Sequence, residues 1–232
     1  MAYKGLELGS LDSEIVGVLN CLIVENNIKK YIEPYIGFGS IIGNIQCENK
    51  YGSDPNKYIV ALLNYLSNGG DIPESMSLGE YEDVKAHYHC KSKVYSDWYY
   101  GLIGFALSGA DETKPFHSRY ITQDALNDAY LKLKSNIENH RSYVSDTVFT
   151  TGQVDSLSDD LKGALIYCKI PKYKRFSADK FLNKLFELSK HNYVVLRTES
   201  IYSEFELLWE EYTGVKTLGK QTVKLYRIES TD

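Results

Sequence analysis

The sequence predicts an α/β fold, and three features of its pattern support this prediction. Short apolar runs alternate with amphipathic helical segments at both ends of the chain, which is typical of a mostly parallel sheet. The middle of the chain is almost entirely helical in pattern. Two strand-like segments close the chain and would add an antiparallel edge. We therefore expect one α/β domain, formed by residues 1–72 and 143–232, with a helical insertion at 73–142.

Each expected element before the insertion has a local signal. Apolar residues recur at helical spacing from Leu11 to Leu22, and a second amphipathic run stops at Asn68-Gly69-Gly70. Two short segments, one ending at Glu33-Pro34 and one closed by Asp54-Pro55, have the character of strands. The predicted elements here are helices at 11–26 and 57–66 and strands at 30–34 and 49–53.

The same reasoning covers the insertion and the second half of the chain. Helical spacing predicts three helices in the insertion, at 78–90, 97–107 and 122–139. After the insertion we expect strands at 147–150 and 164–168, a helix at 178–189, a strand at 193–197 and a closing pair of strands at 205–211 and 223–228.

Composition narrows the class of protein. The chain has 232 residues, of which 43% are apolar and 25% are charged, so it can bury a core of ordinary size. Its formal net charge of −5 argues against a strongly basic nucleic-acid-binding protein, although a local basic surface remains open. No apolar run approaches the roughly 18 residues of a membrane span, and no signal peptide is evident. We therefore expect a soluble, cytoplasmic protein with no membrane partner.

The cysteines and histidines give no sign of a metal site. The four cysteines are scattered without a Cys-x-x-Cys pair, so we interpret them as reduced thiols and expect Cys21 and Cys168 to be buried. His87-Tyr88-His89-Cys90 lies on a predicted helix, where residues two apart do not share a face. No second cluster completes a tetrahedral site, and we expect no metal.

A glycine turn follows the first predicted strand. Gly37 and Gly39 would let a ligand approach the backbone closely. Asp54 stands 17 residues after Gly37, near the roughly 20 residues that separate a glycine turn from a ribose-hydroxyl acceptor in nucleotide-binding folds. On this pattern alone, a turn of purely structural value remains an equally good interpretation.

Several motifs resemble the Dam-type DNA N6-adenine methyltransferases. Residues 31–40, Tyr-Ile-Glu-Pro-Tyr-Ile-Gly-Phe-Gly-Ser, resemble the family's cofactor motif, and residues 53–63 resemble the motif in which an Asp and an Asn open a helix. Residues 163–173 align with the family's catalytic segment, and Tyr3-x-Gly5 resembles its N-terminal motif. The resemblance spans nearly the whole chain in the right order. It implies a Rossmann-like S-adenosylmethionine-dependent methyltransferase fold in which the insertion is a target-recognition domain.

The resemblance also implies roles for individual residues. Asp54 would accept the ribose hydroxyls of S-adenosylmethionine. Phe38 stands where the family often has a small residue, which would crowd the cofactor. The other residues implied in cofactor binding are Tyr3, Gly5, Glu33, Tyr35, Gly37 and Gly39.

The catalytic motif departs from the family pattern. The family's Asp-Pro-Pro-Tyr accepts hydrogen bonds from the adenine amino group and stacks on the flipped base. This sequence has Lys169, Ile170, Pro171 and Lys172 there, and Tyr173 could stack only if the loop shifts. Lysine offers donors and no acceptor, so Lys169 cannot replace the Asp. Glu7 likewise stands where the family has a Lys. The resemblance therefore implies a protein with no intact catalytic residues. Such a protein could have kept or lost the binding of S-adenosylmethionine.

Two basic segments are candidate contacts with nucleic acid. One follows the fourth predicted strand and carries Lys169, Lys172, Lys174 and Arg175, and the other carries Lys114 and Arg119 in the insertion. An equally good interpretation of the first is a solvated loop balanced by Asp155, Asp159 and Asp160.

Three functions follow from these observations. The first is a catalytically inactive relative of the family that binds DNA or a protein partner, with a phage-related regulatory or counter-defence role by analogy alone. The second is an active, site-specific DNA N6-adenine methyltransferase. The third is a pure protein-binding module, which the net charge of −5 favours.

Overall fold

The computed structural model describes residues 10–107, 114–117, 120–170, 177–198, 206–215 and 219–228. Seven strands form one sheet in the order β3-β2-β1-β4-β5-β7-β6. β1 pairs in parallel with β2 and β4, β4 pairs in parallel with β5, and β7 runs antiparallel to both β5 and β6. This is a Rossmann-like methyltransferase fold with an antiparallel edge, so the predicted fold class is confirmed.

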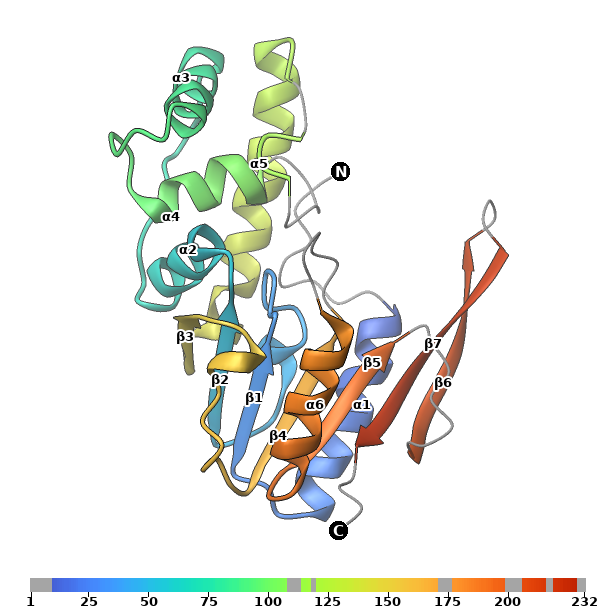
Figure 1. The fold of residues 1–232 in the computed structure, drawn as a ribbon. Helices are drawn as coiled ribbons and strands as arrows, with labels where there is room; N and C mark the ends of the chain where they lie inside the picture. The colour runs from blue at the N-terminus through green and yellow to red at the C-terminus, as the bar shows by residue number, and fades with distance from the viewer. Residues whose placement is uncertain are drawn as a thin grey trace. The chain divides into compact units, whose positions relative to one another are not determined.

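The strands and helices follow the predicted order (Figure 1). The strands are β1 Lys30–Pro34, β2 Asn49–Asp54, β3 Thr147–Thr151, β4 Ala164–Lys169, β5 Tyr193–Thr198, β6 Glu206–Val215 and β7 Gly219–Ile228. The α-helices are α1 Ser10–Glu25, α2 Lys57–Ser67, α3 Leu78–His89, α4 Asp97–Tyr100, α5 Gln123–His140 and α6 Ala178–Ser189. Short helical turns are η1 Ile42–Asn44, η3 Arg141–Val144 and η4 Val154–Ser156, and η2 Gly101–Ala106 is a π-helix.

The structure differs from the predicted elements in two places. The helix expected at 97–107 is α-helical only over α4 and continues as the π-helix η2. The closing strands β6 and β7 are each longer than predicted, because their pairing extends to Val215 opposite Gly219. The β-propensity of the residues does not predict these extensions, because strand formation also depends on pairing with a neighbouring strand.

Residues cluster into two compact units, which we describe separately. Among the described residues, the helical unit comprises 36–44 and 54–151, and the sheet unit comprises 10–35, 45–53 and 152–228. The predicted insertion, 73–142, lies within the helical unit. The predicted domain boundaries themselves stay a prediction.

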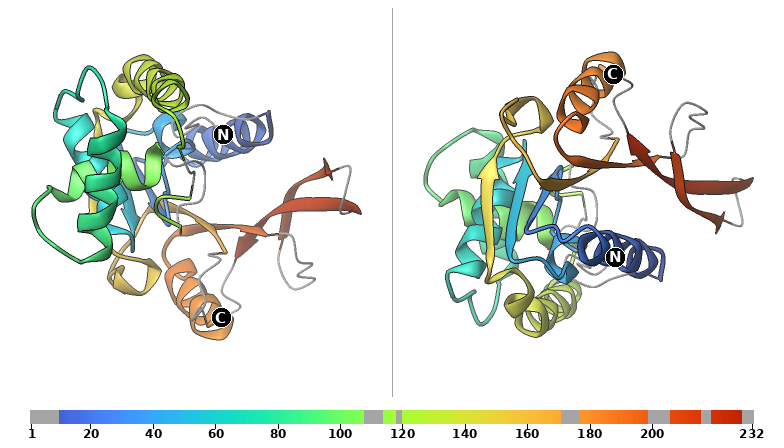
Figure 2. Two further views of the ribbon diagram at one scale, coloured as in Figure 1. Left: turned by 90° about the horizontal axis from the view of Figure 1, so that it is seen from above. Right: turned by 90° about the horizontal axis from the view of Figure 1, so that it is seen from below.

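The sheet unit is built around the central parallel strands. α1 and α6 lie on opposite faces of these strands (Figure 2). Alternate residues of β4 and β5, such as Ile166 and Leu196, join Leu185 and Leu188 of α6 in one apolar core. Since successive strand residues face opposite sides, Leu165, Tyr167 and Lys169 of β4 belong to the other face.

Helix caps and close packing define the helical unit. Ser77 and Thr122 accept hydrogen bonds from Glu80 N and Ala125 N at the starts of α3 and α5. At Gly101, a Cβ atom would come within 2.2 Å of the Tyr58 carbonyl oxygen, so a side chain cannot fit where η2 meets α2. The segment after α4 is therefore held against α2 by a contact that requires glycine.

One prediction of burial is confirmed and one is wrong. Cys168 is buried in the core of the sheet unit, whereas Cys21 is exposed. α1 buries Ile15, Leu19 and Ile23, which follow one another at four-residue spacing. Cys21 falls between them in sequence and so lies on the opposite side of the helix.

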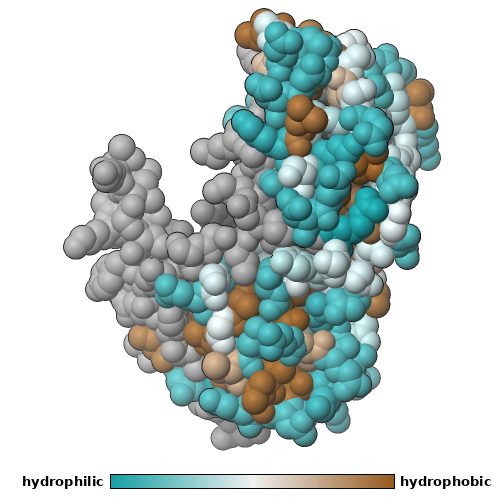
Figure 3. Space-filling view, turned by 180° about the vertical axis from the view of Figure 1, so that it is seen from behind, coloured by the Kyte–Doolittle hydropathy of each residue, from teal (hydrophilic) through white to brown (hydrophobic). Residues whose placement is uncertain are grey.

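The surface is mostly polar where Figure 3 shows it, with apolar side chains in small patches. The large apolar side chains that are exposed in the described part of the chain are Val24, Tyr51, Val94, Ile121, Leu131, Tyr143, Val148 and Leu207. No helix in the described ranges is long and apolar enough to cross a membrane.

Candidate functional site

The turn after β1 is built on residues with positive φ. Gly37 and Gly39 have φ values of 53° and 80°, and Tyr35 has a φ of 64°. The left-handed region suits glycine, because it has no Cβ to clash with the backbone. Gly39 N donates to the Ile36 carbonyl at 3.0 Å, and Gly43 N donates to the Gly39 carbonyl at 3.0 Å, which leads the chain into η1. The predicted glycine turn is therefore present.

Asp54, the last residue of β2, holds this turn. Its Oδ2 accepts a hydrogen bond from Gly37 N at 3.1 Å, and its Oδ1 accepts one from Asn56 N at 2.8 Å. The carboxylate is buried, with only 1% of Asp54 exposed. Asn56 in turn caps α2 by accepting from Tyr58 N at 3.1 Å. Asp54 and Asn56 therefore join the glycine turn to the start of α2, and this is the structural basis for the spacing found in the sequence.

The predicted ribose-binding role of Asp54 stays a prediction. A carboxylate offers about four acceptor positions, and two of them are used by the backbone donors of Gly37 and Asn56. In this structure the Asp54 carboxylate holds the glycine turn.

Glu33 belongs to the sheet unit, on the face of β1 opposite the apolar core. It is only 3% exposed, and its Oε2 accepts a hydrogen bond from the Tyr31 hydroxyl at 3.0 Å. Burial and the neighbouring Glu33 carboxylate raise the pKa of Tyr31 well above its ordinary value, so this phenol stays protonated at neutral pH. Tyr35 lies in the same unit, where it packs against Phe181 of α6 with ring centroids 6.1 Å apart.

Sequence reasoning missed a polar cluster on the same face of the sheet. Arg197 of β5 pairs with Asp12 of α1 at 2.9 Å. Burial raises the pKa of the adjacent Tyr167 hydroxyl, and the Arg197 guanidinium offsets part of that rise. Arg197 and Asp12 are 185 residues apart. The alternation along β5 places Arg197 on the face opposite the core, but nothing local in the sequence predicts its partner.

The end of β4 is basic, as the sequence indicated. β4 ends at Lys169, which is paired in register with Arg197 of β5. Ile170 N then donates to the Arg197 carbonyl at 3.4 Å, and the Ile170 side chain packs against the apolar core of the sheet unit. β4 thus ends in a lysine and is followed by a partly buried apolar residue, with no carboxylate at the position where the family resemblance implies one.

Only some of the other residues predicted to contact nucleic acid lie in the described part of the chain. Lys114 is exposed. Asp159, considered as a counter-charge for the basic loop, pairs with Lys184 of α6 at 2.6 Å. The predicted residues outside the described part of the chain are Tyr3, Gly5, Glu7, Arg119, Pro171, Lys172, Tyr173, Lys174 and Arg175.

The structure assigns the predicted site residues to the two units as follows. Gly37, Phe38, Gly39 and Asp54 lie in the helical unit, where Gly37 and Asp54 are in direct contact. Glu33, Tyr35 and Lys169 lie in the sheet unit.

No group of three or more His, Cys, Asp or Glu side chains suited to a metal ion occurs in the described part of the chain. Within the histidine segment of α3, His87 Nδ1 lies 2.7 Å from the Ser92 hydroxyl oxygen. This contact joins the end of α3 to the loop that follows it.

No protein-family model and no curated protein matches the sequence. Among solved structures, the chain is similar to an rRNA methyltransferase, aviRa, from Streptomyces viridochromogenes, with 11% identity, a TM-score of 0.47 and coverage of 98% of this chain and 90% of that one. It is similar to a putative methyltransferase, yhhF, from Escherichia coli, with 8% identity, a TM-score of 0.42 and coverage of 97% and 89%.

A third similar structure is an S-adenosylmethionine-dependent methyltransferase from Clostridium acetobutylicum, with 10% identity, a TM-score of 0.35 and coverage of 100% of this chain and 76% of that one. At such scores these likenesses support no conclusion about reaction or substrate. The fold assignment rests on the strand order and strand directions described above.

Proposed function

We propose that this chain is a catalytically inactive relative of the Dam-type DNA N6-adenine methyltransferases that binds a macromolecule, DNA or protein. The observation that carries the proposal is the end of β4, where Lys169 stands in register with Arg197 and the partly buried Ile170 packs against the core. Methyl transfer to an exocyclic amino group needs an acceptor that orients the amine, and an ammonium group has none. A phage-related regulatory or counter-defence role rests on the family resemblance alone.

A specific observation favours the alternative, an active N6-adenine methyltransferase. The glycine turn is intact, and the buried Asp54 carboxylate holds it through Gly37 N at 3.1 Å. The backbone of such a turn can approach a ligand closely, because glycine has no Cβ. These residues fit S-adenosylmethionine, which would supply the methyl group. In this alternative, an unusual loop after β4 would hold the target amine.

The first experiment is calorimetric titration of the purified protein with S-adenosylmethionine, followed by a methyl-transfer assay on adenine-containing duplex DNA. Our proposal predicts no methyl transfer, whether or not the cofactor binds. Detectable, cofactor-dependent methylation of adenine would overturn it and support the active enzyme. Cofactor binding without transfer would mean that the turn is retained as a ligand site in an inactive protein.

A pair of variants tests the acceptor argument directly. Lys169→Asp places a carboxylate at the end of β4, and Lys162→Asp makes the same charge change at an exposed position before the strand. The proposal predicts that neither variant gains methyl-transfer activity, because the loop that follows also departs from the family motif. A gain in Lys169→Asp alone would favour the active-enzyme alternative.

The type of partner is a separate question. The net charge of −5 favours a protein partner over DNA. A gel-shift titration with duplex DNA over a range of salt concentrations separates the two, because binding through phosphates weakens steeply as salt rises. A salt-dependent shift would support DNA as the partner, and its absence would support a pure protein-binding module.

A further inference from the structure

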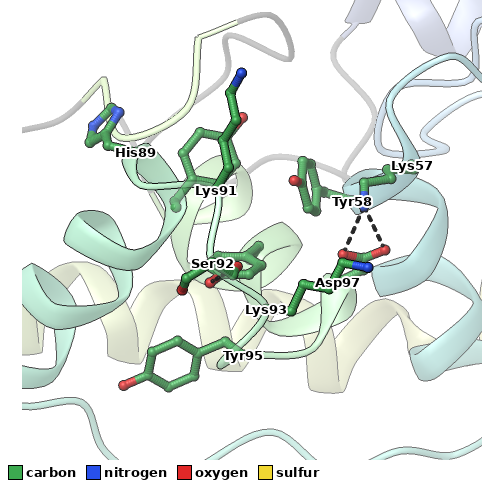
Figure 4. A pocket seen from close by; sticks show the side chains of 10 residues that line it. Lys57, Tyr58, His89, Lys91, Ser92, Lys93, Tyr95 and Asp97 are labelled. Atoms are coloured by element: carbon green, nitrogen blue, oxygen red, sulfur yellow. Dashed lines mark hydrogen bonds and ion pairs between the residues drawn. The ribbon is translucent and has the colours of Figure 1, made fainter.

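A pocket in the helical unit is lined by none of the residues discussed so far as cofactor-binding or catalytic residues. It has a volume of about 660 Å³ and is lined from the start of α2, the end of α3, the loop that follows and the start of α4 (Figure 4). This volume falls within the roughly 300–1,000 Å³ of pockets that hold small molecules. No pattern in the sequence singled it out.

One wall of the pocket is aromatic. Tyr58, Tyr88 and Tyr100 contact one another with ring centroids 5.4–5.7 Å apart. Tyr100 is buried, and its hydroxyl donates to the Ser92 carbonyl at 3.1 Å, so its position is fixed. Tyr58 and Tyr88 are partly exposed, and their hydroxyls form no hydrogen bond with any described residue. This wall can therefore stack on a planar group and bond to its polar edge.

Three lysines, Lys57, Lys91 and Lys93, also line the pocket. Lys57 pairs with Asp97 at 3.0 Å, and Figure 4 shows Lys93 extending toward this pair while Lys91 extends away from it. Neither Lys91 nor Lys93 forms an ion pair with a carboxylate in the part of the chain that the structure describes. With one carboxylate and three lysines, the lining has an excess of positive charge, in a chain whose net charge is −5. Such a lining favours an anionic ligand.

Lys91 is held in a conformation that disfavours lysine. Its φ is 54°, and it follows the end of α3 at the position where Lys91 N donates to the Tyr88 carbonyl and Ser92 N donates to the His87 carbonyl. This pair of bonds ends many helices, and glycine is the preferred residue at this position. A lysine there costs conformational free energy, and such costs concentrate at binding sites.

We propose that this pocket binds a nucleoside phosphate, with the base against Tyr58 and Tyr88 and the phosphate on Lys91. An aromatic wall recognises the planar base, and the Lys91 ammonium group recognises the phosphate. The nucleotide can be free or can belong to a nucleic-acid strand, because the recognised chemistry is the same. The proposal does not depend on the function proposed above, since it uses no residue of the glycine turn or of β4.

Calorimetric titration tests the ligand class. The probes are the four nucleoside 5′-monophosphates, adenosine, inorganic phosphate and a short single-stranded oligonucleotide. We expect at least one monophosphate to bind more tightly than adenosine or inorganic phosphate, because base and phosphate are both recognised. Equal affinity for inorganic phosphate and the monophosphates would overturn the aromatic half of the proposal. Failure of all the monophosphates and of the oligonucleotide at millimolar concentration would overturn it entirely.

A glycine substitution separates binding from folding. Lys91→Gly removes the ammonium group but suits the backbone, so Tm should be unchanged or higher by about 2–4 °C. Affinity for the monophosphate should fall about tenfold. The control is Lys132→Ala, which removes one exposed charge from α5 and should leave affinity unchanged. An equal loss of affinity in the two variants would indicate only a general charge effect and would overturn the proposal.

The cysteines report where the ligand binds and distinguish its source. Cys90 is exposed next to Lys91, and Cys21 is exposed in the sheet unit as an internal reference. A bound monophosphate should slow alkylation of Cys90 relative to Cys21. Protection by the oligonucleotide alone, lost in Lys91→Gly, would identify a nucleic-acid strand as the source. Binding that leaves Cys90 unprotected and is insensitive to Lys91→Gly would place the ligand elsewhere and reject this pocket.

Discussion

At the scale of single residues, the Asp54 side chain fixes the backbone of two segments, the glycine turn and the start of α2. Its two oxygens accept hydrogen bonds from Gly37 N and Asn56 N, and the first of these bonds is buried while the second is partly buried. A buried donor that loses its acceptor costs more than the bond itself contributes. The Asp54 carboxylate is therefore needed for the turn whether or not the turn holds a cofactor.

We expect Asp54→Asn to lower the free energy of unfolding by about 1–3 kcal/mol. The amide has one acceptor oxygen, so its NH₂ group would face one of the two backbone donors. Urea denaturation measures the effect. Asp160→Asn, at an exposed position, is the matched control and should change stability by no more than about 0.5 kcal/mol. Equal stability of wild type and Asp54→Asn would refute the structural role.

The cysteines allow a second prediction at this scale. Cys21 and Cys90 are exposed, and Cys168 is buried in the core, where burial raises the pKa of its thiol. Because the thiolate is the reactive form, Cys168 should resist alkylation until the protein unfolds, while Cys21 and Cys90 react early. Mass spectrometry of a labelling time course measures this order. Modification of Cys168 at the rate of Cys21 under native conditions would contradict the packing of β4.

At the scale of elements, α4 and η2 pack against α2 through Gly101. The Cβ of any larger residue would lie 2.2 Å from the Tyr58 carbonyl oxygen, which is backbone and cannot move aside cheaply. π-Helices are rare and occur often near functional sites. η2 continues directly from α4, whose first turn lines the pocket proposed to bind a nucleotide.

Two glycine substitutions test this contact. Gly101→Ala should lower the free energy of unfolding by about 1–3 kcal/mol or more, because it overpacks a buried contact. Gly79→Ala lies in α3 with no atom within 4 Å of the new Cβ and should raise stability by up to about 1 kcal/mol. Chemical denaturation of the two variants gives the comparison. A neutral Gly101→Ala would mean that α4 and η2 do not pack on α2 as described.

At the scale of the whole molecule, buried tyrosines couple folding to alkaline pH. Burial raises the pKa values of Tyr31, Tyr99, Tyr130 and Tyr167 above the ordinary value near 10. These phenols keep their protons in the folded protein at a pH where the unfolded chain releases them. The folded state thus binds more protons, and stability falls as pH rises above about 10.

We therefore expect the unfolding temperature to be insensitive to tyrosine ionisation below about pH 10 and to drop above it. Absorbance at a wavelength specific for tyrosinate, recorded together with circular dichroism, measures ionisation and folding in one experiment. Part of the tyrosine signal should appear only when the protein unfolds. Complete ionisation of all 20 tyrosines with the fold intact would rule out this coupling.

Much of the fold was predictable from local sequence. The alternation of apolar runs and helical periodicity sets the order and type of the elements, since these signals lie within a few residues of one another. The prediction of Cys21 as buried failed because it used residue type alone and not the position on the helix. For the candidate site, the glycine turn and the basic end of β4 were visible in the sequence, whereas the contacts that hold them were not.

The sequence by itself determined the succession of strands and helices, the glycine turn after β1 and the lysine at the end of β4. These are properties of short segments, decided by local backbone preferences and residue chemistry. Only the tertiary structure decided that Asp54 holds Gly37, that Arg197 pairs with Asp12 and that Lys57 pairs with Asp97. Such partners are far apart in the chain and meet only after the elements pack, so no local pattern specifies them. The tyrosine and lysine pocket of the helical unit arises for the same reason.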